Sequence, residues 1–198
     1  MKLLHLWHIM VLTAVSTGLR RGELLALKWD DIDLEKGYLQ VRRSLGQTKG
    51  NIALKAPKTK SSRRRISIPQ FLTKALKSHK KEQMETRLQV GKGYNDQDMV
   101  FANLDGGWIS PHSFSHAFQY RVKDVEFNKK KVRLHDLRHT LASQLLLIGA
   151  HPKVVSERLG HSSISITLDI YSHLLSGIDE EATNKIDEVL SSTLSFKN

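Results

Sequence analysis

The stretch LHLWHIMVLTAVSTGLRRGELLALKW, residues 4–29, predicts two helices joined at a glycine. Residues 4–16 are mostly apolar, as in a buried helix, and Gly18 follows as the glycine that commonly ends one. RGELLALKW, residues 21–29, indicates a second, short helix. Arg20 precedes that helix, at a position where backbone N–H groups and the helix dipole favour an anion.

A small strand region follows, and the rest of the chain is expected to be helical. YLQVRR at residues 38–43 and RISI at residues 65–68 alternate in polarity, so they predict two strands joined by a basic, lysine-rich segment. A further short strand is expected at residues 99–102. Helices are expected at Gln70–Val90, Ser110–Phe127, Leu134–Ile148, Pro152–Leu159 and Ile164–Leu175. This pattern predicts a mainly α fold with a small antiparallel β-sheet, in the α+β class.

The composition is that of an ordinary globular protein. The chain has 198 residues, of which 39% are hydrophobic and 26% charged, so one domain is the default expectation. It has no cysteine, which excludes a thiol catalyst, a zinc–thiolate site and an iron–sulfur cluster. No apolar run is long enough for a membrane span, and the first twenty residues lack a signal-peptide cleavage pattern. We therefore expect an intracellular protein that has no membrane partner.

The charge is strongly positive and unevenly distributed. The formal net charge is +11, which favours a polyanionic partner such as nucleic acid. Residues 49–65 contain seven basic residues and no acidic one, and residues 121–138 contain seven basic and three acidic ones. A single charge run is usually only a solvated surface. Two such runs in a basic chain favour nucleic acid.

Candidate chemistry comes from polar residues within the predicted helices. HDLRH, residues 135–139, places His135, Arg138 and His139 on one helix face, and the planar arginine fork suits a phosphate. LGHSS sets His161 at the end of a short helix, and Tyr171 follows ten residues later. Each feature alone is weak, because a lone tyrosine is usually a half-buried aromatic residue with a hydrogen-bonded hydroxyl.

Taken together, these motifs resemble the catalytic domain of the tyrosine recombinases, the phage integrase family. The resemblance rests on TGLRRGE, PKTK, HDLRH, LGH and the tyrosine, in that order and spacing, and covers the chain from Leu4 to about His173. The sequence is most similar to integrases of phages and conjugative transposons. The fold that the resemblance implies, mainly helical with a small antiparallel sheet, agrees with the pattern read from the residues.

The resemblance assigns roles to individual residues. Glu23 matches the acidic position after the first arginine and is expected to hold that arginine by charge. Lys55 and Lys60 lie close to the lysine position on the β-hairpin, but the Lys-Thr pair and the strand that follows favour Lys58. The catalytic residues implied are the arginines Arg20 and Arg138, the hairpin lysine Lys58, the histidines His135 and His161, and the nucleophile Tyr171.

The resemblance also implies an activity and partners. It implies a DNA strand transferase that cleaves and rejoins double-stranded DNA in site-specific recombination, through a 3′-phosphotyrosyl intermediate. No metal or high-energy cofactor is expected. The implied assembly is a homotetramer on DNA, with accessory DNA-bending or directionality proteins. The implied location is the cytoplasm, in association with the nucleoid when DNA is bound.

The domain organisation is expected to comprise a catalytic domain, residues 1–175, and a C-terminal tail, residues 176–198. Because family members usually carry N-terminal DNA-binding domains, this sequence is expected to be an excised catalytic fragment or a truncated homologue. The tail holds an apolar stripe of helical period, which either packs on its own domain or docks on a neighbouring protomer. Its apolar positions are Ile178, Ala182, Ile186, Val189, Leu190 and Leu194.

Three other functions fit parts of the pattern. A type IB topoisomerase would share the chemistry and relax supercoils, although the small size favours a recombinase. A metal-dependent nuclease would need the acidic stretch at residues 30–35, where a solvated turn is the simpler interpretation. A DNA-binding module without catalysis would leave the placement of Tyr171 unexplained. The four carboxylates of that stretch are Asp30, Asp31, Asp33 and Glu35.

Overall fold

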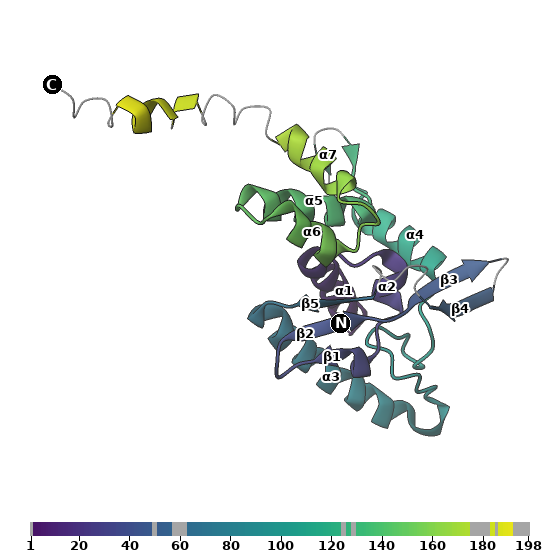
Figure 1. Cartoon of the computed structure of the whole chain (residues 1–198). Helices are drawn as coiled ribbons and strands as arrows, with labels where there is room; N and C mark the ends of the chain where they lie inside the picture. Colours follow the sequence, from purple (N-terminus) through teal and green to yellow (C-terminus); the bar gives the residue numbers. More distant parts are fainter. Residues whose placement is uncertain are drawn as a thin grey trace.

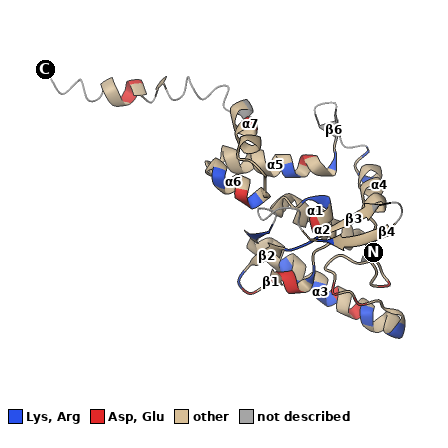
Figure 2. Ribbon diagram, turned by 45° about the vertical axis from the view of Figure 1, so that its right-hand side comes forward, with Lys and Arg blue, Asp and Glu red and all other residues tan. Residues whose placement is uncertain are grey.

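Helices enclose a small antiparallel sheet in the computed structural model (Figure 1). The structure describes residues 2–48, 51–56, 63–123, 126–127, 130–174, 183–184 and 186–191. The helices are α1 (Lys2–Thr17), α2 (Arg21–Leu25), α3 (Gln70–Val90), α4 (Pro111–Arg121), α5 (Leu134–Leu147), α6 (Pro152–Leu159) and α7 (Ser165–Leu174), with 3-10 turns η1 (Trp29–Asp31) and η3 (Gly91–Gly93). In both ribbon views α3 lies on one side of the strands, and α5 and α6 lie on the other (Figures 1 and 2). The predicted fold class, mainly α with a small antiparallel sheet, is confirmed.

The main sheet has three antiparallel strands in the order β1-β2-β5, formed by β1 (Ile32–Asp33), β2 (Tyr38–Val41) and β5 (Arg64–Ser67). The alternating pattern of the two longer strands turns one face of each toward the core. Leu39 and Ile66 are opposite each other in the register, and both are buried. The predicted pair of strands is therefore confirmed.

The connection between these two strands differs from the prediction. It contains a second hairpin, β3 (Ser44–Thr48) paired with β4 (Asn51–Lys55), in addition to a basic segment. Alternating apolar residues explain the hairpin, because Leu45 is buried and Ile52 and Leu54 pack against the core. The prediction for this region was based on its basic charge and did not use that alternation.

The helix predicted at residues 21–29 ends early, because the backbone after α2 pairs with a distant segment. The Leu27 carbonyl accepts a hydrogen bond from the Val100 N–H at 2.9 Å, and the Trp29 N–H donates to the Asp98 carbonyl at 3.0 Å. These groups are then not available for continued helical pairing. The predicted short helix is present, but its predicted end at residue 29 was wrong.

Two further predictions were wrong. Residues 99–102 form no strand, since they make only isolated bridges, Lys28 with Met99 and Ala102 with Trp108. Their apolar character reflects complete burial rather than a ladder. The helix expected at Ser110–Phe127 ends at Arg121, where its buried positions of helical spacing run out. Beyond it lies a short hairpin of β6 (Glu126–Phe127) and β7 (Lys130–Lys131).

Two hydrophobic clusters stabilise the fold. The larger one joins α1, α2, α3, α4 and the main sheet; its fully buried members include Ile9, Leu24, Leu39, Leu72, Leu76, Phe101 and Phe114. The smaller one joins α5, α6 and α7; its buried members are Ala142, Leu146, Val155 and Leu159. Helices α5 and α6 thus form a layer with a core of its own. The polar site described below lies where this layer meets α1, α2 and β5.

The described part of the tail is helical and does not pack on the domain. Ile186, Val189 and Leu190 are all more than half exposed. The other three residues of the apolar stripe lie outside the described residues. Among the helices that the structure describes, none is long and apolar enough to cross a membrane.

Candidate active site

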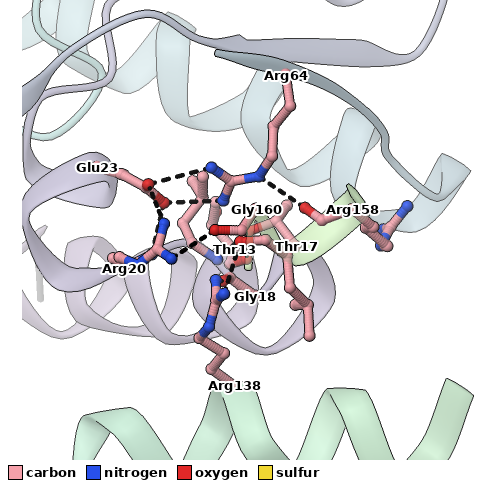
Figure 3. A network of polar contacts seen from close by, with 11 residues as sticks. Thr13, Thr17, Gly18, Arg20, Glu23, Arg64, Arg138, Arg158 and Gly160 are labelled. Atoms are coloured by element: carbon pink, nitrogen blue, oxygen red, sulfur yellow. Dashed lines mark hydrogen bonds and ion pairs between the residues drawn. The ribbon is translucent and has the colours of Figure 1, made fainter. Parts of the chain in front are cut away.

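Three arginines donate hydrogen bonds to three consecutive carbonyl groups at the end of α6 (Figure 3). Arg64 Nε lies 2.7 Å from the carbonyl oxygen of residue 158, Arg138 Nη2 lies 2.6 Å from that of residue 159, and Arg20 Nη2 lies 2.6 Å from that of Gly160. Carbonyls at a helix C-terminus lack intrahelical partners, and the helix dipole favours cations there. The end of α6 therefore gathers guanidinium groups from β5, from α5 and from the segment before α2.

The carboxylate of Glu23 joins two of these arginines. Arg64 donates to both of its oxygens, at 3.1 and 2.9 Å, and Arg20 Nη1 donates to Oε1 at 3.0 Å. Burial raises the pKa of Glu23, but the hydrogen bonds and charges of Arg64 and Arg20 outweigh it and lower the pKa overall. Glu23 is thus held ionised, although only 6% of it is exposed.

Arg138 is buried almost completely, with 4% of its surface exposed, and also donates to the Gly18 carbonyl. Burial, followed by the charges of Arg20 and Arg64, lowers its pKa to about 9, so it remains charged at neutral pH. Three guanidinium groups around one carboxylate leave an excess of positive charge at low dielectric. Such a site is suited to an anion.

A pocket of about 330 Å³ opens beside Arg20 and Arg138. Among the described residues, its wall contains no carboxylate, and Arg21 donates to the Ser115 hydroxyl at 2.6 Å within it. The lining residues are Leu19, Arg20, Arg21, Ser115, Phe118, Gln119, Arg133, Leu134, His135 and Arg138. The pocket brings together both arginines and one histidine of the predicted site.

The two histidines of the predicted site are neutral at physiological pH. Burial, then the charges of Arg138 and Arg20, lowers the pKa of His161 to about 4. Its Nδ1 lies 2.8 Å from the Thr167 hydroxyl. Burial, then the neighbouring His139, lowers the pKa of His135, whose ring centroid lies 4.6 Å from that of His139. Both imidazoles can exchange hydrogen bonds without adding further charge to the arginine cluster.

Tyr171 lies on α7, packed half-buried against the smaller hydrophobic cluster. Among the described residues it is not part of the pocket wall. Lys58 and Lys60 lie outside the described residues, and Lys55 is the exposed last residue of β4. The structure therefore groups Arg20, Glu23, Arg138, His135 and His161, and it places the tyrosine on an adjacent helix.

The carboxylates of the acidic stretch at residues 30–35 stabilise the local turn and a nearby ion pair. Asp31 is buried and pairs with Arg43 at 3.2 Å, and Asp33 accepts hydrogen bonds from the backbone of the two residues numbered 35 and 36. Within the described part of the chain, no group of three His, Cys, Asp or Glu side chains is arranged to hold a metal ion.

Sequence reasoning missed Arg64 as a member of the cluster. Its signal was the alternation in RRRISI, where Arg64 shares a strand face with the buried Ile66 and Ile68. An arginine on the core face of a strand requires a buried partner, because an unpaired buried charge is costly. That partner, Glu23, lies 41 positions away in the sequence.

Solved structures of other proteins share the fold of this chain. The fold matches that of the Tn1549 transposon integrase solved in complex with transposon right end DNA, with a TM-score of 0.75 and 24% identity, covering 93% of this chain and 58% of that one. It also matches the XerA recombinase, with a TM-score of 0.62 and 25% identity, covering 93% of this chain and 62% of that one. The fold is that of integrases and site-specific recombinases.

The model of the phage integrase family matches residues 6–177, and the chain belongs to this family. It is 39% identical to a tyrosine recombinase XerC-like protein of Caldanaerobacter subterraneus over 195 residues, covering 92% of this chain and 49% of that protein. It is 36% identical to the ICEBs1 integrase of Bacillus subtilis, covering 89% of this chain and 47% of that protein. The chain spans about half the length of these relatives.

Replacing Gly160 with alanine tests the end of α6. Gly160 has φ +68°, and a Cβ there would lie 2.8 Å from Arg64 Nη1. The matched control is Gly149→Ala, since Gly149 has φ +84°, ends α5 with the hydrogen bonds of a left-handed glycine cap, and has open space around it. We expect Gly149→Ala to lose about 1–2 kcal/mol of unfolding free energy from backbone strain alone, and Gly160→Ala to lose clearly more in urea titrations. Equal losses of unfolding free energy in the two variants would show that Arg64 moves away from the added Cβ without loss of stability.

The titration of His161 tests the electrostatics of the cluster. NMR of the folded chain should show the His161 ring titrating at about pH 4, against 6.5 for an unperturbed histidine. The urea-unfolded chain is the control and should return the ordinary value. Because the unfolded state binds more protons between these two values, this histidine stabilises the fold above pH 6.5 and loses that contribution as the pH falls toward 4. A folded-state midpoint near 6.5 would contradict the burial and charge described here.

Proposed function

We propose that this chain is the catalytic domain of a site-specific DNA recombinase, which cleaves and rejoins double-stranded DNA through a 3′-phosphotyrosyl intermediate. The observation that carries the proposal is the pair Arg20 and Arg138 beside a pocket whose described lining residues include no carboxylate. Membership of the phage integrase family supports it. Figure 2 shows blue Lys and Arg segments on several elements of the body, including α3, α5 and α6, in keeping with a polyanionic substrate.

Cleavage in this proposal is a transesterification. The Tyr171 hydroxyl attacks the scissile phosphorus, its Oη–P bond forms, and the bond from phosphorus to the 5′-oxygen breaks. His135 accepts the tyrosine proton, and Lys58 donates a proton to the departing 5′-oxygen. A 5′-hydroxyl then attacks the phosphotyrosyl bond in the reverse sense and rejoins the DNA.

The arginine cluster supplies the transition-state stabilisation. Negative charge grows on the phosphoryl oxygens during the attack, and Arg20 and Arg138 are preorganised cationic donors for it. With the Thr167 hydroxyl donating to its Nδ1, His161 donates a further hydrogen bond through Nε2–H. The chemistry then proceeds by general acid–base and electrostatic catalysis from the residues of this chain.

The active assembly in this proposal is a homotetramer on DNA, aided by accessory DNA-bending or directionality proteins in the cytoplasm. The exposed tail residues Ile186, Val189 and Leu190 would dock on a neighbouring protomer. The apolar side chains Leu147 and Ile148, exposed at the end of α5, offer a surface for such contact. Because the tail follows α7 directly, docking would couple the position of Tyr171 to the neighbour.

Replacing Tyr171 with phenylalanine tests the nucleophile. The chain is incubated in EDTA with a nicked suicide duplex, and covalent adducts are counted on denaturing gels. Tyr171→Phe should form no adduct and should keep its non-specific DNA affinity, because one neutral hydroxyl contributes little to phosphate binding. Tyr94→Phe is the matched control and should react like the wild type. An adduct from the Tyr171→Phe chain would disprove the assignment. Cleavage without an adduct in a parallel reaction with Mg²⁺ in place of EDTA would favour a metal-dependent nuclease.

Deleting residues 178–198 tests the tail. We expect weaker assembly on DNA, measured by analytical ultracentrifugation, and loss of strand exchange, while the shortened chain still unfolds in one cooperative thermal transition. Ile148→Ser in the complete chain removes apolar surface from the opposite side of the proposed contact and should weaken assembly in the same way. If the deletion abolishes the cooperative transition, the tail is part of the core of the catalytic domain in the same protomer.

A further inference from the structure

Arg64 is enclosed by polar partners on both sides of its guanidinium group. Its side chain is only 6% exposed, and it joins β5 to the end of α6 and to Glu23 on α2. Among the described residues, it does not line the pocket that Arg20 and Arg138 share. A role for Arg64 in the reaction must therefore pass through other residues.

The Arg20 guanidinium donates hydrogen bonds to Glu23 and to the end of α6, and Arg64 binds both of these groups as well. Arg20 Nη1 binds Glu23 Oε1, the same oxygen that Arg64 Nη1 binds at 3.1 Å. Arg20 Nη2 binds the carbonyl of Gly160, two residues beyond the carbonyl that Arg64 Nε binds at 2.7 Å. The planar guanidinium group of Arg64 thus sets the distance between the Glu23 carboxylate and the end of α6. These are the two groups that orient Arg20.

The shape of the arginine side chain is essential to this arrangement. Arg64 binds both oxygens of one carboxylate with its terminal nitrogens and a carbonyl in another direction with Nε, which a lysine ammonium on a flexible stem cannot reproduce. Replacing a buried ion pair by apolar groups is often neutral for stability. Arg64 therefore contributes orientation to the site in addition to its contacts between β5, α2 and the end of α6.

We propose that Arg64 is a positioning residue for strand cleavage, which acts through Glu23 and the end of α6 to hold the Arg20 guanidinium at the site of a non-bridging phosphate oxygen. This inference rests on the proposed recombinase function for the identity of the phosphate. It adds to the recombinase site a residue that touches neither the nucleophile nor the pocket.

The first test compares cleavage by Arg64→Lys and by the double variant Glu23→Gln/Arg64→Met with the wild type in single-turnover reactions on the suicide duplex. The double variant removes both members of the buried Arg64–Glu23 pair, so neither is left without the other, and it serves as the folded variant if Arg64→Lys does not fold. Both should cleave about a hundredfold more slowly, the scale of a misplaced catalytic group, with DNA affinity within about twofold of the wild type, as befits a residue outside the pocket. Arg87→Met removes an exposed arginine–carboxylate pair and should cleave like the wild type.

A methylphosphonate at the scissile position separates positioning from a general structural defect. A methyl group in place of one non-bridging oxygen removes the negative charge that Arg20 stabilises. The deficit of Arg64→Lys should therefore shrink at least tenfold on this substrate, together with that of Arg20→Ala. A deficit equal on both substrates would overturn the proposal, as would wild-type cleavage rates in both Arg64 variants.

The second test does not depend on cleavage. In the free wild-type chain, the two terminal nitrogens of Arg20 should give separate NMR signals, because hydrogen bonds to Glu23 and Gly160 hinder rotation of the guanidinium group. Arg64→Lys should average these signals while the backbone spectrum of the rest of the chain is retained. Unchanged Arg20 signals would overturn the positioning role. If the wild type forms no adduct, the recombinase function fails by itself, and these signals still decide the role of Arg64.

Discussion

The hydrogen bonds from three arginines to the last carbonyls of α6 hold the layer of α5 and α6 against α2, β5 and the end of α1. Those carbonyls would otherwise be unpaired helix ends, and the guanidinium groups come from segments as distant as residues 20, 64 and 138. Gly160 permits this arrangement, because its left-handed backbone ends the helix and its missing Cβ leaves room for Arg64. The helix end is therefore a structural joint, and it also anchors the arginines of the site.

The electrostatics of the site follow from that joint. One buried carboxylate, Glu23, accompanies three guanidinium groups, so the cluster is positive and its members repel one another. Burial, and after it this repulsion, lowers the pKa values of Arg138 and His161. A phosphate in the adjoining pocket would relieve it, and the donors would not need to reorganise at the moment of reaction. The fold thus holds cations close together before any substrate is present.

Tyr171, the proposed nucleophile, belongs to a different part of the architecture. Tyr171 packs on the small cluster of α5, α6 and α7, whereas the arginines are anchored between that cluster and the rest of the core. The described geometry leaves it outside the pocket wall. A separate helix with exposed apolar residues in the tail behind it suits a nucleophile whose position depends on assembly. The arginine cluster is built within one chain, and we propose that the tyrosine is set by its neighbours.

The sequence by itself determined most of the helices and the motif residues. α3 and α6 were predicted with their observed ends, because apolar spacing and neighbouring Pro or Gly residues are local signals. Only the tertiary structure decided where α2 stops, since Leu27 and Trp29 pair with the segment around residue 100, and that residues 44–55 form a hairpin. It also decided the partners of Arg64, which lie 41 and 94 positions away. Local periodicity carries no information about such pairings, because they depend on which buried charges and backbone groups meet once the chain has folded.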